Sequence, residues 1–318
     1  MKAARIHEFG PPSVIVIEDV PRPTPGPGEV LVSVAAAGVG PWDGWIRSHT
    51  SVVQVPLPLT LGSDLSGFIE EIGSGVSGFR RGEEIYGVTN ADFTGANAEY
   101  AIASAAMIAP KPRSLDHLQA ASVPVVAVTA WQMLFEYGKA TAGQTVLIHG
   151  AAGNVGAYAV QLAHVANLKI FATCSSEDAP YVRSLGATNV IDYTTTKFED
   201  EVPSVDIVID TVGGDIQERS VQVVKSGGII VSSVSPFPGT PNRADVSTAF
   251  FLVDVTTARL NAITELIDRQ ELSTQVGTVL PLEEAPTAHQ MLEGSPHKRG
   301  KIVLAVNIKV QASSGDLA

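Results

Sequence analysis

The chain has 318 residues, enough for two domains with sizeable hydrophobic cores. A formal net charge of −12 argues against nucleic acid or an anionic membrane surface as the main partner. The single cysteine, Cys174, excludes an intrachain disulfide and a cysteine-rich zinc site. The first ten residues contain no apolar signal core, and no run approaches the roughly 18 apolar residues of a membrane span. We therefore expect a cytoplasmic protein.

Residues 1–123 consist of short apolar runs separated by glycine- and proline-rich turns, which predicts a compact β domain. The candidate strands are Ala3–Ile6, Val14–Glu18, Val30–Ala35, Phe68–Ile72, Glu84–Gly87 and Glu99–Ile102. The next segment, Ala120–Phe135, has the periodicity of a buried helix. Within it, the Thr129 hydroxyl either donates to a carbonyl one turn earlier or serves a functional site.

From Thr145 onward, strand and helix patterns alternate, which predicts βαβ units and a parallel sheet. The strand candidates are 145–150, 169–173, 189–191, 205–210, 228–233 and Ala249–Val253, and the helix candidates are 154–166, 178–185, 214–224 and 257–269. A strand at Gln275–Leu280, a helix at 283–293 and a strand at 301–306 return to the first domain. We expect residues 311–318 to form a flexible tail.

A glycine turn, Gly150–Gly156, joins the strand at 145–150 to the following helix and resembles a dinucleotide-binding fingerprint. Gly153 allows a pyrophosphate to approach the backbone, and the first N–H groups of the helix, from Asn154 and Val155, point toward it. Ala151 replaces the first glycine of the usual pattern, so a tight turn of an unrelated α/β protein remains an alternative. We expect His149 to be a core residue.

Five stretches, taken together, resemble the zinc-independent quinone oxidoreductase (zeta-crystallin-like) branch of the medium-chain dehydrogenase/reductase superfamily. They are Gly62–Gly67, Thr129–Gln132, Gly150–Gly156, Ile191–Tyr193 and Arg299–Val303. The resemblance implies a GroES-like β domain from 1–123 and 275–310, and a doubly wound Rossmann domain from 124–274. It implies an active site in the cleft between them and a homodimer joined edge to edge, for which Ala249–Val253 is a candidate edge.

The zinc site of the alcohol dehydrogenases in this superfamily has no counterpart in the sequence. The family's first cysteine ligand falls at Gly40, its Gly-His-Glu motif is Gly62-Ser63-Asp64, and Ala91–Ser104 contains no cysteine. Relatives usually carry Asn at position 40, so Pro41 or a water must fill that space. Without a Lewis acid, the substrate must accept hydride readily, which favours quinones and activated C=C bonds.

The residues that follow the strand at 169–173 indicate whether the cofactor is NADH or NADPH. Ser175 and Ser176 stand where NAD-binding domains usually carry an acid, and hydroxyls can donate to a 2′-phosphate. By resemblance, Tyr193 contacts the same phosphate. We therefore expect NADPH, while the carboxylates Glu177-Asp178 keep NADH as an alternative.

By resemblance, Asp43, Trp45 and Arg47 lie at the mouth of the cleft, and Thr129 contacts the nicotinamide. An Asp43–Arg47 pair is equally well explained as structural. Trp45 replaces a tyrosine common in relatives and cannot give up a proton, so we expect solvent to be the proton donor. The residues expected to flank the cofactor, for which core packing is the alternative, are Val212, Val234, Phe251 and Val253. An aromatic pocket for a flat quinone is expected from Trp42, Trp45, Phe93 and His49, although the two tryptophans alternatively only pack the β domain.

The predicted activity is hydride transfer from NADPH to a quinone. The alternatives are an NADPH-dependent reductase of enones and enals, and a nucleotide-binding protein with little catalysis, a role that the family's lens crystallins illustrate.

Overall fold

The structure is a computed structural model and describes residues 1–307, so the predicted tail 311–318 lies outside the described residues. The chain forms two compact units. Among the described residues, the first contains Met1–Pro124, Val255–Asp268 and 274–307, and the second contains Val125–Asp254 and Arg269–Ser273. The fold class is mixed α/β, with a GroES-like β domain and a Rossmann domain. The domain boundaries expected from the sequence stay a prediction.

The first unit is built around a seven-stranded sheet with the order β15-β16-β3-β5-β6-β8, in which β7 also pairs with β3. Its strands are β3 (Glu29–Val39), β5 (Asp64–Ile72), β6 (Glu84–Val88), β7 (Tyr100–Ser104), β8 (Ile108–Pro110), β15 (Val276–Pro281) and β16 (Lys301–Ala305). A three-stranded sheet contains β1 (Lys2–Ile6), β2 (Val16–Asp19) and β4 (Leu59–Thr60). The two sheets share one apolar core, to which Ile6, Val32 and Leu304 belong.

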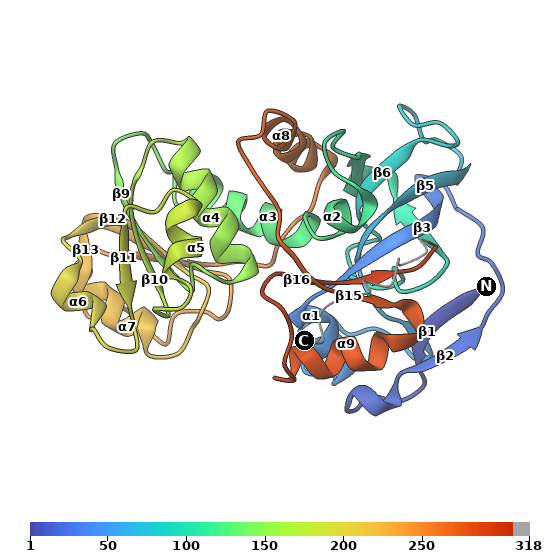
Figure 1. The fold of residues 1–318 in the computed structure, drawn as a ribbon, viewed down its shortest axis with the longest axis horizontal. Helices are drawn as coiled ribbons and strands as arrows, with labels where there is room; N and C mark the ends of the chain where they lie inside the picture. Colours follow the sequence, from blue (N-terminus) through green and yellow to red (C-terminus); the bar gives the residue numbers. More distant parts are fainter. Residues whose placement is uncertain (308–318) are drawn as a thin grey trace, which may run out of the picture. The chain divides into compact units, whose positions relative to one another are not determined.

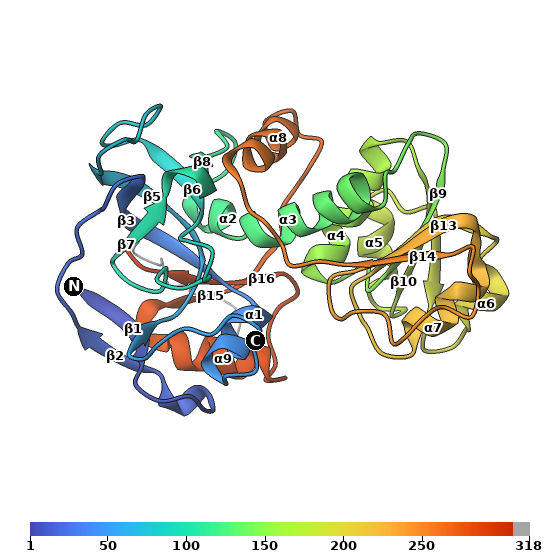
Figure 2. The ribbon, with the colours of Figure 1, turned by 180° about the vertical axis from the view of Figure 1, so that it is seen from behind.

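The helices of the first unit are short. They are α1 (Pro41–Arg47), α2 (His117–Ala121), α8 (Thr257–Asp268) and α9 (Ala285–Leu292). Helix α8 lies beside β8 in the first unit (Figure 2). Hydrogen bonds hold it there: the Thr257 hydroxyl donates to the carbonyl of Ile108, and the Tyr86 hydroxyl donates to that of Leu260.

The second unit is a parallel sheet with helical crossovers (Figure 1). Its strands are β9 (Thr145–His149), β10 (Lys169–Cys174), β11 (Asn189–Asp192), β12 (Val205–Asp210), β13 (Val224–Ser232) and β14 (Ser247–Phe250). Their spatial order, β11-β10-β9-β12-β13-β14, is that of a doubly wound dinucleotide fold. Strands are added to one side of β9 up to β11 and to its other side from β12 onward. Such sheets bind ligands at this reversal of strand order, between β9 and β12.

The helices of the second unit are α3 (Pro124–Trp131), α4 (Asn154–Val165), α5 (Ala179–Ser184), α6 (Phe198–Glu201) and α7 (Ile216–Ser220). Buried aliphatic side chains from the strands, such as Leu147, Val208 and Ile230, form the core of this unit. No helix among residues 1–307 is long and apolar enough to cross a membrane.

Three predicted elements differ from the observed ones. The expected helix Ala120–Phe135 is divided into α2, α3 and a π-helical turn at Gln132–Tyr137, because Pro124 lacks the N–H needed to continue α2. Instead of the helix expected at 214–224, the structure has the short helix α7 followed by a 3₁₀ turn, and β13 begins at Val224. The strand expected at Ala249–Val253 ends at Phe250, because Phe251 turns inward and stacks on Tyr137.

Candidate functional site

The glycine turn lies at the carboxyl end of β9, at the switch point of the parallel sheet. Gly150 has φ +69°, a left-handed conformation that favours glycine. Gly153 is the N-cap of α4 and has no side chain to bond the first N–H groups of the helix, which include those of Asn154 and Val155. These groups can therefore donate to a phosphate. At Gly156, a Cβ would lie 2.8 Å from Ala151 Cα, so only glycine lets the turn fold this tightly.

Two apolar side chains are exposed at the same end of the sheet. Val212 follows β12 and is 48% exposed, and Val234 follows β13 and is 39% exposed. The fully buried Asp210 organises this rim, because its carboxylate accepts hydrogen bonds from the backbone N–H groups of Val212 and Gly213 and from the Gln217 side chain. The sequence did not single out Asp210, although an acid that ends a buried strand is a usable signal.

The hydroxyl groups after β10 lie beside carboxylates. Ser175 Oγ donates to Asp178 Oδ2 at 2.9 Å, and Ser176 bonds Asp192. Hydrogen bonds from Thr194 hold the pKa of Asp192 below its usual range, with a smaller contribution from Ser176. Tyr193 is 64% exposed immediately after β11. This corner therefore offers two hydroxyls and an exposed ring to a ribose, and both hydroxyls already have acidic neighbours.

Thr129 and Phe251 have structural contacts of their own. The Thr129 hydroxyl donates to the Val125 carbonyl at 2.7 Å, one turn earlier, which leaves its oxygen free only to accept. The Phe251 ring is buried and stacks on Tyr137 with 4.4 Å between ring centroids, while Val253 is half-buried. For the side chain of Phe251, core packing is the better explanation.

The residues predicted on α1 of the first unit have different environments. Trp45 is 48% exposed, whereas Arg47 is 2% exposed. Arg47 donates to the Gly10 carbonyl, contacts His289 Nδ1 at 2.9 Å and forms an ion pair with Glu293. Burial, with the nearby guanidinium adding to it, lowers the pKa of His289 to about 3. Arg47 thus fixes α9 against α1, and its side chain is buried.

Asp43 is fully buried beside the start of α1. Its Oδ2 accepts the Gly40 N–H at 2.8 Å, while its Oδ1 finds no hydrogen-bond partner among residues 1–307. Burial raises the pKa of this carboxyl to about 7, an effect partly opposed by the Gly40 hydrogen bond and the charge of Lys301. Asp43 is therefore not the salt-bridge partner of Arg47.

Trp42, rather than Pro41 or a water, fills the space beside Gly40. A Cβ at residue 40 would lie within 2.6 Å of Trp42 Cζ2. The indole N–H donates to Ser63 Oγ at 2.9 Å, and Asp64 Oδ2 pairs with Lys301 Nζ at 2.9 Å. These residues do not fit zinc, because Gly40 has no donor atom and Asp64 is already neutralised by an ammonium group. Among residues 1–307, no cluster of three His, Cys, Asp or Glu side chains is suited to a metal.

His149 is a core residue, as expected. Its Nδ1 lies 3.1 Å from Thr173 Oγ1, and its Nε2 lies 3.1 Å from Ser220 Oγ. Burial lowers the pKa of this imidazole to about 4, so it is neutral at pH 7 and held by two hydroxyls.

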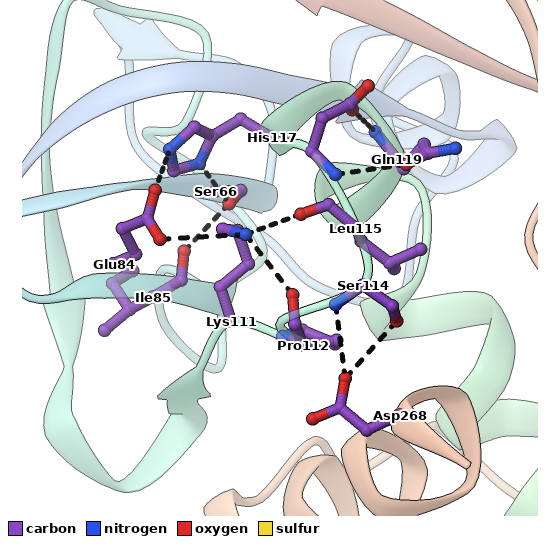
Figure 3. A network of polar contacts seen from close by, with 11 residues as sticks. Ser66, Glu84, Ile85, Lys111, Pro112, Ser114, Leu115, His117, Gln119 and Asp268 are labelled. Carbon is purple, nitrogen blue, oxygen red and sulfur yellow. Dashed lines mark hydrogen bonds and ion pairs between the residues drawn. The ribbon is translucent and has the colours of Figure 1, made fainter. Parts of the chain in front are cut away.

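A Ser–His–Glu arrangement in the first unit has the residue types of a hydrolase triad (Figure 3). Ser66 Oγ lies 2.8 Å from His117 Nδ1, and His117 Nε2 lies 3.2 Å from Glu84 Oε1. The Ser66 hydroxyl, however, donates to the Ile85 carbonyl at 2.9 Å and is fully buried. The imidazole must then donate to Ser66, so it cannot act as the base that would activate this serine.

Comparisons with known proteins place the chain among dehydrogenases and oxidoreductases. Residues 26–113 match the alcohol dehydrogenase GroES-like domain, and residues 185–304 match the zinc-binding dehydrogenase family. A quinone oxidoreductase of Rattus norvegicus is 30% identical over 96% of this chain and 97% of its own length. The mitochondrial NAD(P)H oxidoreductase RTN4IP1 of Homo sapiens is 31% identical over 88% of this chain and 82% of its own. The structure of a quinone oxidoreductase from Coxiella burnetii has a TM-score of 0.88 and 33% identity, covering 96% of this chain and 99% of the other.

Proposed function

The chain belongs to the quinone oxidoreductases of the medium-chain dehydrogenase/reductase superfamily, and on that premise we propose that it reduces quinones with NADPH and without zinc. Its relatives make it an NAD(P)H-dependent oxidoreductase. The proposal for the acceptor depends on one observation: Gly40, Ser63 and Asp64 provide no set of zinc ligands. Because no metal would polarise the acceptor, it must accept hydride readily, as a quinone does.

We propose that the dinucleotide lies along the carboxyl ends of the parallel strands of the second unit. Gly153, Asn154 and Val155 would hold the pyrophosphate through backbone N–H groups, and the exposed Val212 and Val234 would be covered by the cofactor. The Thr129 oxygen, whose proton is donated to Val125, is available to accept from the nicotinamide carboxamide. For Phe251 and Val253, the proposed contact is through the backbone.

Ser175, Ser176 and Tyr193 support NADPH over NADH. The residue that ends β10 is Cys174, so the acid that usually accepts from the ribose 2′-OH is missing there. The exposed Tyr193 phenol can donate to a 2′-phosphate, and the two serine hydroxyls can do so once they turn away from Asp178 and Asp192. Asp178 opposes this preference, because it already accepts from Ser175.

At the acceptor, the reduced nicotinamide supplies a hydride when bound, and the protein supplies orientation. Hydride transfer to a quinone leaves an anion that must take up one proton. Trp45 cannot give up a proton, and Arg47 is buried in its ion pair with Glu293. We therefore propose solvent as the proton donor. Asp43 would shape α1 through Gly40 and is not proposed to transfer the proton.

The edge strand β14 is the proposed homodimer contact. Among residues 1–307 it pairs only with β13, and Phe250 at its end and Leu252 just after it are exposed. An uncovered edge with apolar neighbours promotes pairing with a second copy.

Steady-state oxidation of NADPH, measured against 1,4-naphthoquinone and against 2-butenal, tests the proposed activity. We expect kcat/KM for the quinone to exceed that for the alkenal by at least about tenfold. A higher value for the alkenal would support a C=C reductase. Binding of NADPH without oxidation by either acceptor would support a nucleotide-binding role.

A further inference from the structure

A hollow of about 710 Å³ lies in the first unit, beside the start of α2. Its lining comes mainly from β3, β5, β6 and α2, and includes none of the residues proposed above for the cofactor or the acceptor. Phe68, which is 39% exposed, and Leu118 supply an apolar wall, while Glu84, Lys111 and His117 supply polar groups (Figure 3). This size and mixture of side chains are typical of a site for a small molecule.

The ammonium group that lines the hollow already has partners. Lys111, whose side chain is 7% exposed, donates to the carbonyl oxygens of Pro112 and Leu115. Its charge is paired with that of Glu84, whose Oε2 lies 3.7 Å from Nζ. Two of its three N–H donors are therefore used and its charge is neutralised, so Lys111 is not suited to hold an anionic ligand.

The imidazole of His117 has a lone pair at Nε2. Ser66 Oγ gives its only proton to the Ile85 carbonyl, so His117 Nδ1, 2.8 Å away, must be the donor to Ser66. Burial, opposed in part by the charge of Glu84, lowers the pKa of His117 below 6.5. The ring is therefore neutral at about pH 7.5, and its proton lies on Nδ1.

Two hydrogen-bond acceptors consequently face one another beside the hollow. His117 Nε2 is buried without a hydrogen-bond partner among residues 1–307, and Glu84 Oε1 lies 3.2 Å from it. The Glu84 side chain is 51% exposed, so it can turn aside and share a donor with Nε2. Because no proton lies between the two atoms, a ligand with several N–H groups would satisfy both.

The charges that line the hollow favour a cation. Glu84 and Asp116 carry two carboxylates against the one ammonium of Lys111, which leaves a net negative charge. The chain as a whole has a formal net charge of −12, which also attracts cations. An N–H donor that is itself charged forms the stronger hydrogen bond to a carboxylate.

We propose that this hollow binds a small organic ammonium ion, which donates to Glu84 and His117 Nε2 and places its apolar part against Phe68 and Leu118. The inference goes beyond the proposed quinone reductase function and does not depend on it.

Calorimetric titration of the full-length protein with benzylammonium chloride at about pH 7.5 tests the site, with benzyl alcohol as an uncharged probe of the same shape. We expect a Kd of about 1 mM for benzylammonium and binding at least about tenfold weaker for benzyl alcohol. Equal affinity for the two probes, or no binding of benzylammonium, would overturn the proposal.

A matched pair of variants locates the binding. Glu84→Gln should weaken benzylammonium binding about tenfold, because the amide has no charge and can itself donate to His117 Nε2. Glu83→Gln removes the adjacent carboxylate, which accepts from the Arg80 N–H and does not line the hollow, and should change the Kd less than about twofold. Equal weakening by both variants would show that the overall charge attracts the ion, and would overturn the proposal.

Phe68→Ala tests the apolar wall and decides the outcome if Glu84→Gln does not fold. It removes the ring and leaves both acceptors, so benzylammonium should bind at least about threefold more weakly. An unchanged Kd in folded Phe68→Ala would overturn the proposed site.

Discussion

The buried carboxyl group of Asp43 makes the stability of the protein depend on pH in a way that one substitution isolates. Burial raises its pKa from 3.8 to about 7, and one of its oxygens finds no hydrogen-bond partner among residues 1–307. The folded protein therefore keeps a proton that the unfolded chain releases. This contribution to the free energy of unfolding is fully present below about pH 3.8 and is lost as the pH rises to about 7.

The size of the effect follows from the two pKa values. A difference of about three pKa units corresponds to about 4 kcal/mol over the full range, and to about 2.5 kcal/mol between pH 5 and pH 8. In Asp43→Asn this titration is absent. The free energy of unfolding of the variant, relative to wild type, should therefore rise by about 2.5 kcal/mol from pH 5 to pH 8. Any cost of leaving an amide N–H unpaired does not depend on pH and cancels.

Urea denaturation of both proteins at each pH, followed by tryptophan fluorescence, measures this difference. Trp42 and Trp45, near Asp43 in sequence, report on the same domain. Asp92→Asn, which removes an exposed carboxylate, controls for the loss of one charge. A variant-minus-wild-type difference that stays the same within about 0.5 kcal/mol at both pH values would show that Asp43 is already ionised in the folded protein.

Three further substitutions test the second unit. Gly156→Ala should lower the free energy of unfolding by about 1–3 kcal/mol, measured by thermal denaturation, because the new Cβ would lie 2.8 Å from Ala151 Cα. Asp178→Asn should raise kcat/KM for NADPH relative to NADH several-fold, because it removes a carboxylate that accepts from Ser175. Thr129→Val should raise the KM for NADPH several-fold, because the hydroxyl no longer accepts from the nicotinamide carboxamide. It should also cost about 1 kcal/mol of stability, because the hydrogen bond to the Val125 carbonyl is lost.

Each of these substitutions has a control. Gly153→Ala should destabilise less than Gly156→Ala, since its Cβ would approach only Gly150 O, at 3.2 Å; the reverse order would contradict the account of the turn. Glu177→Gln removes the neighbouring exposed charge, and an Asp178→Asn effect no larger than this one would mean that Asp178 does not face the ribose. For Thr129→Val, an unchanged KM at lower stability would leave the threonine with a structural role alone.

Much of the fold could be predicted from the sequence because the parallel strands are continuous apolar runs. β9 and β12 are buried on both faces and end at recognisable turns. Helix α1 was missed because it has only seven residues and includes Gly44, so local propensity hardly favours it. Its start is held instead by a hydrogen bond from the Gly40 N–H to Asp43, a contact that sequence spacing alone does not reveal.

The candidate site was predictable where backbone geometry decides the outcome, and not where long-range packing does. Gly156 follows from the turn itself. The burial of Arg47 depends on His289 and Glu293, which are more than 240 residues away in the chain. The position of Trp42 likewise depends on Lys301, at the opposite end of the sequence. Side-chain partners of this kind become visible only once the sheet has brought β16 next to β3.

The most direct test of the proposed function is an anaerobic single turnover of enzyme-bound NADPH with 1,4-naphthoquinone, followed at the nicotinamide absorbance. The account predicts that one NADPH is oxidised for each quinone reduced, far faster than in the absence of enzyme. NADPH that binds but stays reduced when the quinone is added would contradict it.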